Sequence, residues 1–249
     1  MKAYALKLWV EDLTSELKSK AEPGRAREQK RYLKSPYMFY GIRKPLIDQI
    51  ARKFKIDYQA ITPQELIALC AVLWDSNYHE QKSLAIALLK HFPDRWDSKT
   101  TMLVDRMIDE ATGWDHLDEL AIHVLGPLIQ MNLLPLTYLG TCSKAENFWK
   151  RRAALIAQIT FLRRGKGHIA LHLELCRAHL YEKEFFIRKA IGWSLRELAK
   201  NDPDGVSEFL QQNKDQISNL TMREASKNLP DYLKAQIKLP DKGARKSNT

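Results

Sequence analysis

The sequence is poor in cysteine and lacks any stretch typical of a leader or a membrane span. Its three cysteines, Cys70, Cys142 and Cys176, lie far apart and are odd in number. This favours buried free thiols in a reduced compartment over a disulfide framework. The N-terminal segment MKAYALKLWVEDL has no long apolar core and no cleavage site, and no apolar run approaches the ~20 residues needed to cross a bilayer. We therefore expect a soluble, cytoplasmic protein that is not attached to a membrane.

Strand signals and the common catalytic motifs are also missing. No run of alternating β-branched residues occurs, and no G-x-S-x-G, H-E-x-x-H or dinucleotide fingerprint is present. RRGKG at 163–167 has no strand before it, which argues against a P-loop. His168, His172 and His179 share a helix face, but no cysteine or carboxylate completes a metal site there. We expect an all-α protein that uses no metal and no other cofactor.

Basic residues outnumber acidic ones. The chain carries 40 lysines and arginines against 30 aspartates and glutamates, which gives a net charge of +10. Such a charge favours a polyanionic partner, either nucleic acid or an acidic membrane surface. No predicted helix combines a basic face with a large exposed apolar face, so nucleic acid is the better candidate.

The helical pattern repeats along the second half of the chain. NFWKRRAALIAQITFLRR at 147–164 aligns with EFFIRKAIGWSLRELAK at 184–200, placing Arg152 opposite Lys189 at an offset of 37 residues. A period of this length, built from helix pairs, predicts a stacked helical solenoid. In such a fold the second helices line a concave face, where aligned cations can follow a phosphate backbone.

We therefore expect a right-handed α-solenoid of HEAT-like helical repeats with a concave basic face, made of about a dozen helices. Residues 1–238 should form a single domain. Residues 239–249 are polar and basic, and we expect them to be a disordered tail.

The predicted helix 184–201 has two different faces. One side is an ordinary core stripe, consisting of Ile187, Ala190, Ile191, Ser194 and Leu198. The other side carries Trp193 between the cations Lys189 and Arg196. A tryptophan among cations suits contact with a nucleic acid. The alternative is that a neighbouring helix covers this second face, as happens in multilayer helical proteins.

Two upstream segments carry further candidates. In GWDHLDEL, Trp114 and Asp118 are four residues apart and share a helix face, whereas Asp115 points elsewhere and can cap the helix. Pattern alone favours an Asp118 that pairs with a nearby cation over a catalytic carboxylate. The basic helix expected at 25–34 carries Tyr32, and this helix is either a solvated charged face or a phosphate-facing one.

Three of these strings, GWDHLDELAIHVLG, NFWKRRAALIAQI and EFFIRKAIGWSLRELAK, resemble in order and spacing the AlkD family of HEAT-like-repeat alkylpurine DNA glycosylases. RYLKSPYMFYGIRKP at 31–45 is similar to the same family. The resemblance covers about residues 21–233, nearly the whole chain. One departure is visible, because Gly113 stands where family members often carry a second aromatic residue.

The resemblance implies a monofunctional base-excision repair enzyme. Such an enzyme hydrolyses the glycosidic bond of cationic N3- and N7-alkylated purines, such as 3-methyladenine and 7-methylguanine, in double-stranded DNA without extruding the base. By motif, Asp118 corresponds to the catalytic aspartate, and Trp114 and Trp193 to the active-site tryptophans. The implied DNA-binding residues are Tyr32, Arg151, Arg152, Arg188, Lys189 and Arg196. The enzyme would act as a monomer; the alternative is a non-catalytic solenoid that binds DNA as a scaffold or adaptor.

Overall fold

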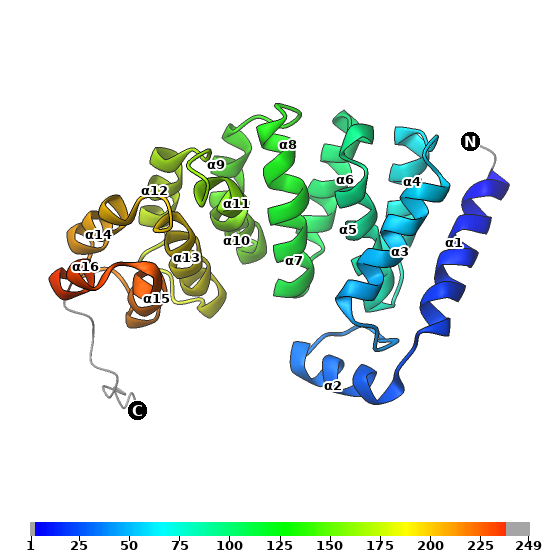
Figure 1. The fold of residues 1–249 in the computed structure, drawn as a ribbon, viewed down its shortest axis with the longest axis horizontal. Coiled ribbons are helices and arrows are strands. Elements are labelled where there is room, and N and C mark those ends of the chain that lie inside the picture. Colours follow the sequence, from blue (N-terminus) through cyan, green and yellow to red (C-terminus); the bar gives the residue numbers. More distant parts are fainter. Residues whose placement is uncertain (1–2, 238–249) are drawn as a thin grey trace. The chain divides into compact units, whose positions relative to one another are not determined.

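The computed structural model describes residues 3–237, and these residues contain helices but no strand. The all-α prediction is therefore confirmed, whereas the predicted tail at 239–249 lies outside the described residues. The helices are α1 (Ala3–Ser19), α2 (Pro23–Leu33), α3 (Lys44–Asp57), α4 (Pro63–Trp74), α5 (His79–His91), α6 (Ser98–Asp109), α7 (Trp114–Leu120), α8 (Gly126–Gln130), α9 (Thr137–Ser143), α10 (Phe148–Ile156), α11 (Ile159–Leu162), α12 (Ile169–Ala178), α13 (Phe185–Leu198), α14 (Pro203–Gln212), α15 (Asn219–Ala225) and α16 (Asp231–Gln236) (Figure 1).

Several helices begin where the sequence supplies a capping side chain. The Thr62 hydroxyl accepts a hydrogen bond from the backbone N–H of Glu65, and the Glu65 carboxylate accepts one from the backbone N–H of Thr62. This capping box starts α4, with Pro63 as its first residue. Asp97 starts α6 in the same way, because its carboxylate accepts from the N–H groups of Lys99 and Thr100.

The chain divides after Leu136 into two compact units. In the first unit, α5 packs against α3 and α4, and α7 packs against α5. The core of this unit contains fully buried leucines from the facing helices, namely Leu66, Leu69, Leu84 and Leu88. The prediction that residues 1–238 form a single domain stays a prediction.

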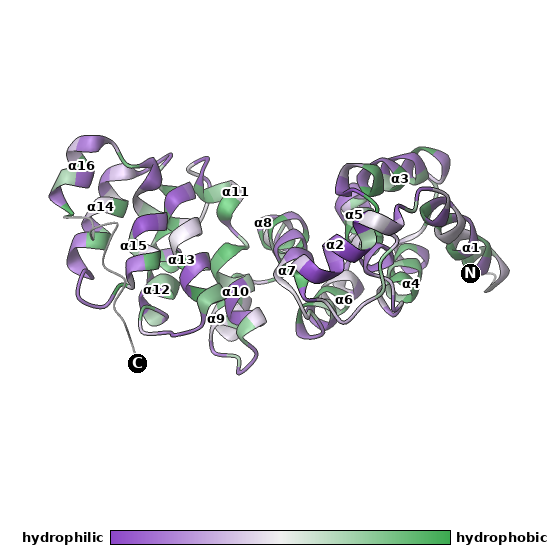
Figure 2. Ribbon diagram, turned by 90° about the horizontal axis from the view of Figure 1, so that it is seen from below, coloured by the Kyte–Doolittle hydropathy of each residue, from purple (hydrophilic) through white to green (hydrophobic). Residues whose placement is uncertain are grey.

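The second unit is organised around α13, which packs against α10 and α15. The predicted core stripe of α13 is confirmed, since its five residues are all buried. Green apolar and purple polar residues share the length of this helix (Figure 2). Gly192 lets α15 approach closely, because a Cβ atom there would lie 2.5 Å from the Cβ of Glu224.

Two helical segments are interrupted. The helix that carries Trp114 and Asp118 continues beyond α7 through a π-helical stretch, Ala121–Leu125, into α8. Pro127 lacks the N–H that would bond to the carbonyl of His123, which loosens the hydrogen-bond ladder at this point. The segment 147–164, which aligns in sequence with 184–200, divides into α10 and α11. Residues 3–237 therefore contain sixteen α-helices rather than about a dozen, and no helix among them is long and apolar enough to cross a membrane.

Candidate functional site

Trp114 and Asp118 lie on successive turns of α7 in the first unit. Trp114 is the first residue of the helix and is half-buried, whereas Asp118 is only 9% exposed. The backbone of Gly113 precedes the helix in an extended conformation and provides no side-chain cap. The structure therefore holds a carboxylate in a largely desolvated position, one turn away from an accessible indole ring.

Tyr32 meets Trp114 edge to face. The centroids of the two rings are 6.3 Å apart and the ring planes are inclined by 87°. Tyr32 is 74% exposed and lies on α2, a helix that buries none of its residues and is drawn largely purple in Figure 2. The structure thus brings Tyr32 and Trp114 together within the first unit.

Since α2 has no buried face, other contacts must hold it. The buried Glu80 carboxylate accepts hydrogen bonds from the backbone N–H groups of Tyr40, Gly41 and Ile42, at 3.0, 2.7 and 3.1 Å. Gly41 adopts a φ of +86°, and a Cβ atom there would lie 2.2 Å from the carbonyl oxygen of Glu22. Glu80 therefore fixes a segment against which the start of α2 rests directly.

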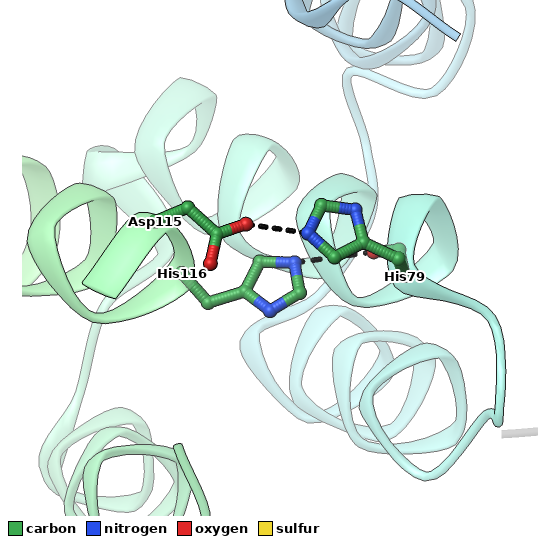
Figure 3. Close-up of side chains that lie close together, drawn as sticks. All are labelled: His79, Asp115 and His116. Atoms are coloured by element: carbon green, nitrogen blue, oxygen red, sulfur yellow. Dashed lines mark hydrogen bonds and ion pairs between the residues drawn. The ribbon is translucent and has the colours of Figure 1, made fainter. Parts of the chain in front are cut away.

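A second polar cluster, formed by His79, Asp115 and His116, joins the starts of α5 and α7 (Figure 3). His79 Nε2 lies 2.5 Å from Asp115 Oδ2. His116 Nε2 lies 3.2 Å from the carbonyl oxygen of His79 and 2.9 Å from Ser83 Oγ. Asp115 was expected as a possible helix cap, but the residue at the N-cap is Gly113, and Asp115 pairs with His79 instead.

The charges in this cluster follow from its burial and its hydrogen bonds. Burial, together with the nearby His79, lowers the pKa of His116 to about 3, so its ring is neutral at pH 7. Burial alone would raise the pKa of Asp115, but the hydrogen bond from His79 and the two neighbouring imidazoles outweigh it and lower the pKa to about 2. A buried neutral imidazole and a half-buried ionised carboxylate therefore lie side by side.

Two imidazoles and a carboxylate, with ligand atoms within 4.8 Å of one another, are also a set that transition metals accept. Each of these side chains is, however, already engaged in a hydrogen bond, His79 with Asp115 and His116 with the carbonyl oxygen of His79. Sequence analysis missed the cluster, because its members are 36 and 37 residues apart. The only signal was the adjacent pair Asp115-His116 next to the candidate Trp114.

In the second unit, Trp193 is half-buried on α13, and its neighbouring cations converge on one carboxylate. Glu224 of α15 lies 3.0 Å from Lys189 Nζ, 3.0 Å from Arg196 Nη1 and 2.7 Å from Lys227 Nζ. Burial would raise the pKa of Glu224, but hydrogen bonds from Lys227 and Lys189 outweigh it and lower the pKa. The neighbouring-helix alternative is therefore correct in part, since α15 supplies a partner to this face.

The other arginines that were predicted to bind DNA have extensive contacts within the protein. Arg152 on α10 is only 5% exposed, and its Nη1 donates to the carbonyl oxygen of Phe186 at 2.5 Å. Arg151 donates to Glu182 at 2.7 Å and to two backbone carbonyls, and Arg188 donates to the carbonyl oxygen of Glu182 at 2.7 Å. Arg151 and Arg188 therefore hold the segment before α13, and their contact with DNA stays a prediction.

Two of the three histidines near α12 lie in the core and the third lies on the surface. His172 is buried, and burial lowers its pKa to about 4. His179 is buried and contacts Ser143 and Glu182, at 2.8 and 3.1 Å. His168 is exposed at the start of the helix.

Comparison with known families decides what kind of protein carries these residues. A family model described as DNA alkylation repair enzyme matches residues 13–229. The chain belongs to this family. No curated protein matches the chain. DNA is accordingly the substrate of this alkylation repair enzyme.

Solved structures agree with this assignment. A predicted DNA alkylation repair enzyme from Enterococcus faecalis is 26% identical, with a TM-score of 0.75 over 84% of this chain and 96% of that chain. AlkD2 from Streptococcus mutans is 18% identical, with a TM-score of 0.65 over 90% of this chain and 99% of that chain, and thus shares its fold. The predicted helical-repeat fold is confirmed, whereas its right-handedness and its concave basic face stay predictions.

The cation cluster around Glu224 leads to a prediction about DNA affinity. Replacing Arg196 by glutamine should weaken binding to undamaged duplex DNA and reduce the slope of log K against log salt by about 1. Glu224→Gln should act in the opposite direction, because it removes the negative charge that offsets part of the cluster. Fluorescence anisotropy titrations at several salt concentrations measure both effects.

Lys234→Gln is the matched control, because Lys234 of the same unit also pairs with a carboxylate, that of Asp231 at 3.1 Å, and neither residue belongs to this cluster. It should change neither the affinity nor the slope. If all three variants behave alike, the cluster has no special role in binding the DNA backbone.

Proposed function

We propose that the chain is a monofunctional DNA N-glycosylase that initiates base excision repair. It hydrolyses the glycosidic bond of cationic N3- and N7-alkylated purines, such as 3-methyladenine and 7-methylguanine, in duplex DNA and leaves the base within the helix. The observation that carries the proposal is the pairing of buried Asp118 with accessible Trp114 on successive turns of α7, in a chain of the alkylation repair family.

The lesion itself supplies much of the driving force. An N3- or N7-alkylated purine carries a positive charge and leaves as a neutral base, so no general acid has to protonate it. Ordinary glycosidases require two carboxylates, because one of them protonates the leaving group. A single carboxylate is therefore sufficient for this class of lesion, and Asp118 is our candidate.

As the glycosidic bond lengthens, positive charge develops on the deoxyribose. A carboxylate that is already desolvated and held in place stabilises this charge without reorganising at the moment of reaction. Asp118 fits the role because α7 keeps it buried. It would also orient the attacking water. Since the carboxylate acts on the sugar rather than on the base, the base need not enter a pocket.

The tryptophans would recognise the charge of the lesion. An indole face attracts a cation with ~0.5 to 2 kcal/mol per contact. Trp114 and Trp193 are both half-buried and retain accessible surface. The cations of the second unit, Lys189 and Arg196, would contact the DNA backbone, which fixes the position of the protein but does not read sequence.

The direct test is to incubate the protein with duplex DNA treated with a methylating agent and to identify released bases by chromatography. We expect free 3-methyladenine and 7-methylguanine, with the DNA backbone left uncut. A non-catalytic scaffold would bind the same DNA and release neither base above the rate without protein, and that result would refute the proposal.

A further inference from the structure

We propose that His79 is a positioning residue, which acts through Asp115 to hold α7 so that Trp114 and Asp118 keep a fixed place relative to Tyr32. This inference rests on the proposed function of α7 and adds a residue from another helix to its site. His79 itself is buried at the start of α5 and has no direct part in the chemistry.

The first step of the argument is that α7 lacks its own N-terminal anchor. It has only seven residues, Gly113 offers no side-chain cap, and a π-helical stretch follows immediately. Short helices depend on tertiary contacts for their stability. The contact of Asp115 with His79, at 2.5 Å, is a charge-assisted hydrogen bond from the neighbouring helix within the first turn of α7.

The second step is that the His79 ring is itself fixed. It is stacked between two other rings, with Phe39 at 4.4 Å and His116 at 4.1 Å between centroids. Since ionised Asp115 only accepts, His79 Nε2 carries the hydrogen, and the bond to Asp115 has a defined direction. The carbonyl oxygen of His79 also only accepts, so neutral His116 carries its hydrogen on Nε2 and donates toward it.

The third step is that the start of α5 also controls Tyr32. Glu80, the next residue, fixes the backbone of 40–42, and Gly41 rests against the start of α2. Two adjacent residues of one helix thus locate both partners of the aromatic pair, Tyr32 through α2 and Trp114 through α7. A small rotation of α7 would separate the rings and displace Asp118.

Three variants separate the hydrogen bond from the packing. His79→Phe keeps a ring in the stack and removes the donor to Asp115, whereas His79→Gln keeps a donor near the position of Nε2 and removes the ring. His91→Phe is the matched control, because His91 ends the same helix and lies 3.2 Å from a different carboxylate, that of Asp48. Single-turnover excision of 7-methylguanine, affinity for undamaged duplex and urea unfolding are measured for each.

We expect His79→Phe to slow excision ~10- to 100-fold, since displacements of about 1 Å have effects of this size, with duplex affinity nearly unchanged. His79→Gln should recover most of the rate although it loses the stack, and His91→Phe should excise normally even if its stability falls. The inference is wrong if His79→Phe excises normally, if His79→Gln is equally slow, or if His91→Phe is slowed as much.

A readout without catalysis separates this inference from the proposed function. In protein labelled with 5-fluorotryptophan, the fluorine resonance of Trp114 is assigned from Trp114→Phe. It should move in His79→Phe and return in His79→Gln, even in a protein that excises nothing. An unmoved resonance overturns the inference. Stoichiometric Zn²⁺ binding that His79→Gln abolishes would overturn it too, by showing that the cluster is a metal site.

Discussion

Replacing Asp118 by asparagine should reduce single-turnover release of 7-methylguanine ~10²- to 10³-fold and leave the affinity for undamaged duplex DNA nearly unchanged. The amide has almost the same size as the carboxylate and fits the same buried position on α7, so packing is conserved. What disappears is the negative charge that opposes the positive charge growing on the deoxyribose. A loss of this size corresponds to about 3 to 4 kcal/mol of transition-state stabilisation.

Glu119→Gln provides the matched control, because Glu119 is the next residue on α7 and also carries a carboxylate. Its side chain is half-buried, forms an ion pair with Lys44 and lies near His123. Loss of this charge should change excision by less than about threefold, as is usual for a partly exposed ion pair. Equal rates for Asp118→Asn and the parent protein would remove Asp118 from the mechanism.

Local signals in the sequence explain why the helices could be predicted well. The capping box at Thr62 and the apolar stripe of the helix at 184–201 each depend on residues that are only a few positions apart in the sequence. The structure contains both. The interruptions at 121–125 and after Ile156 were not predicted. At both places the apolar pattern of the sequence continues without a break and also suits an uninterrupted helix. Hydrophobic periodicity does not record a change of hydrogen-bond partner inside a helix.

For the candidate site too, the sequence predicted relations within one helix but not contacts between helices. The spacing of Trp114 and Asp118 placed them on one helix, and the structure keeps them there. The partner of Lys189 was not predictable, since Glu224 lies on another helix and approaches only because Gly192 has no side chain. The contact between His79 and Asp115 was also missed, because these two residues lie on different helices. Pairing across helices depends on packing, which the pattern of a single helix does not specify.

The charge of the lesion should decide which bases are removed. We expect release of 7-methylguanine from duplex DNA to be accelerated at least ~10³-fold more than release of uracil, each measured against its own rate without protein. Each indole contact with a cation contributes ~0.5 to 2 kcal/mol, and uracil offers no positive charge to such a contact. Uracil would also have to leave as an anion, because the proposed carboxylate form of Asp118 has no proton to give it.

Shape can be separated from charge with 7-methyl-7-deazaguanine, which has the outline of 7-methylguanine but is neutral. Duplex DNA containing it should bind no better than undamaged DNA and should release no base, whereas a pocket that recognises shape would bind it well.

Trp193→Leu should reduce the difference in affinity between duplex DNA with the charged lesion and duplex DNA with its neutral analogue, because leucine has no π face. Equal acceleration for uracil and 7-methylguanine would show that the protein does not select by charge, and the role assigned to both tryptophans would then be wrong.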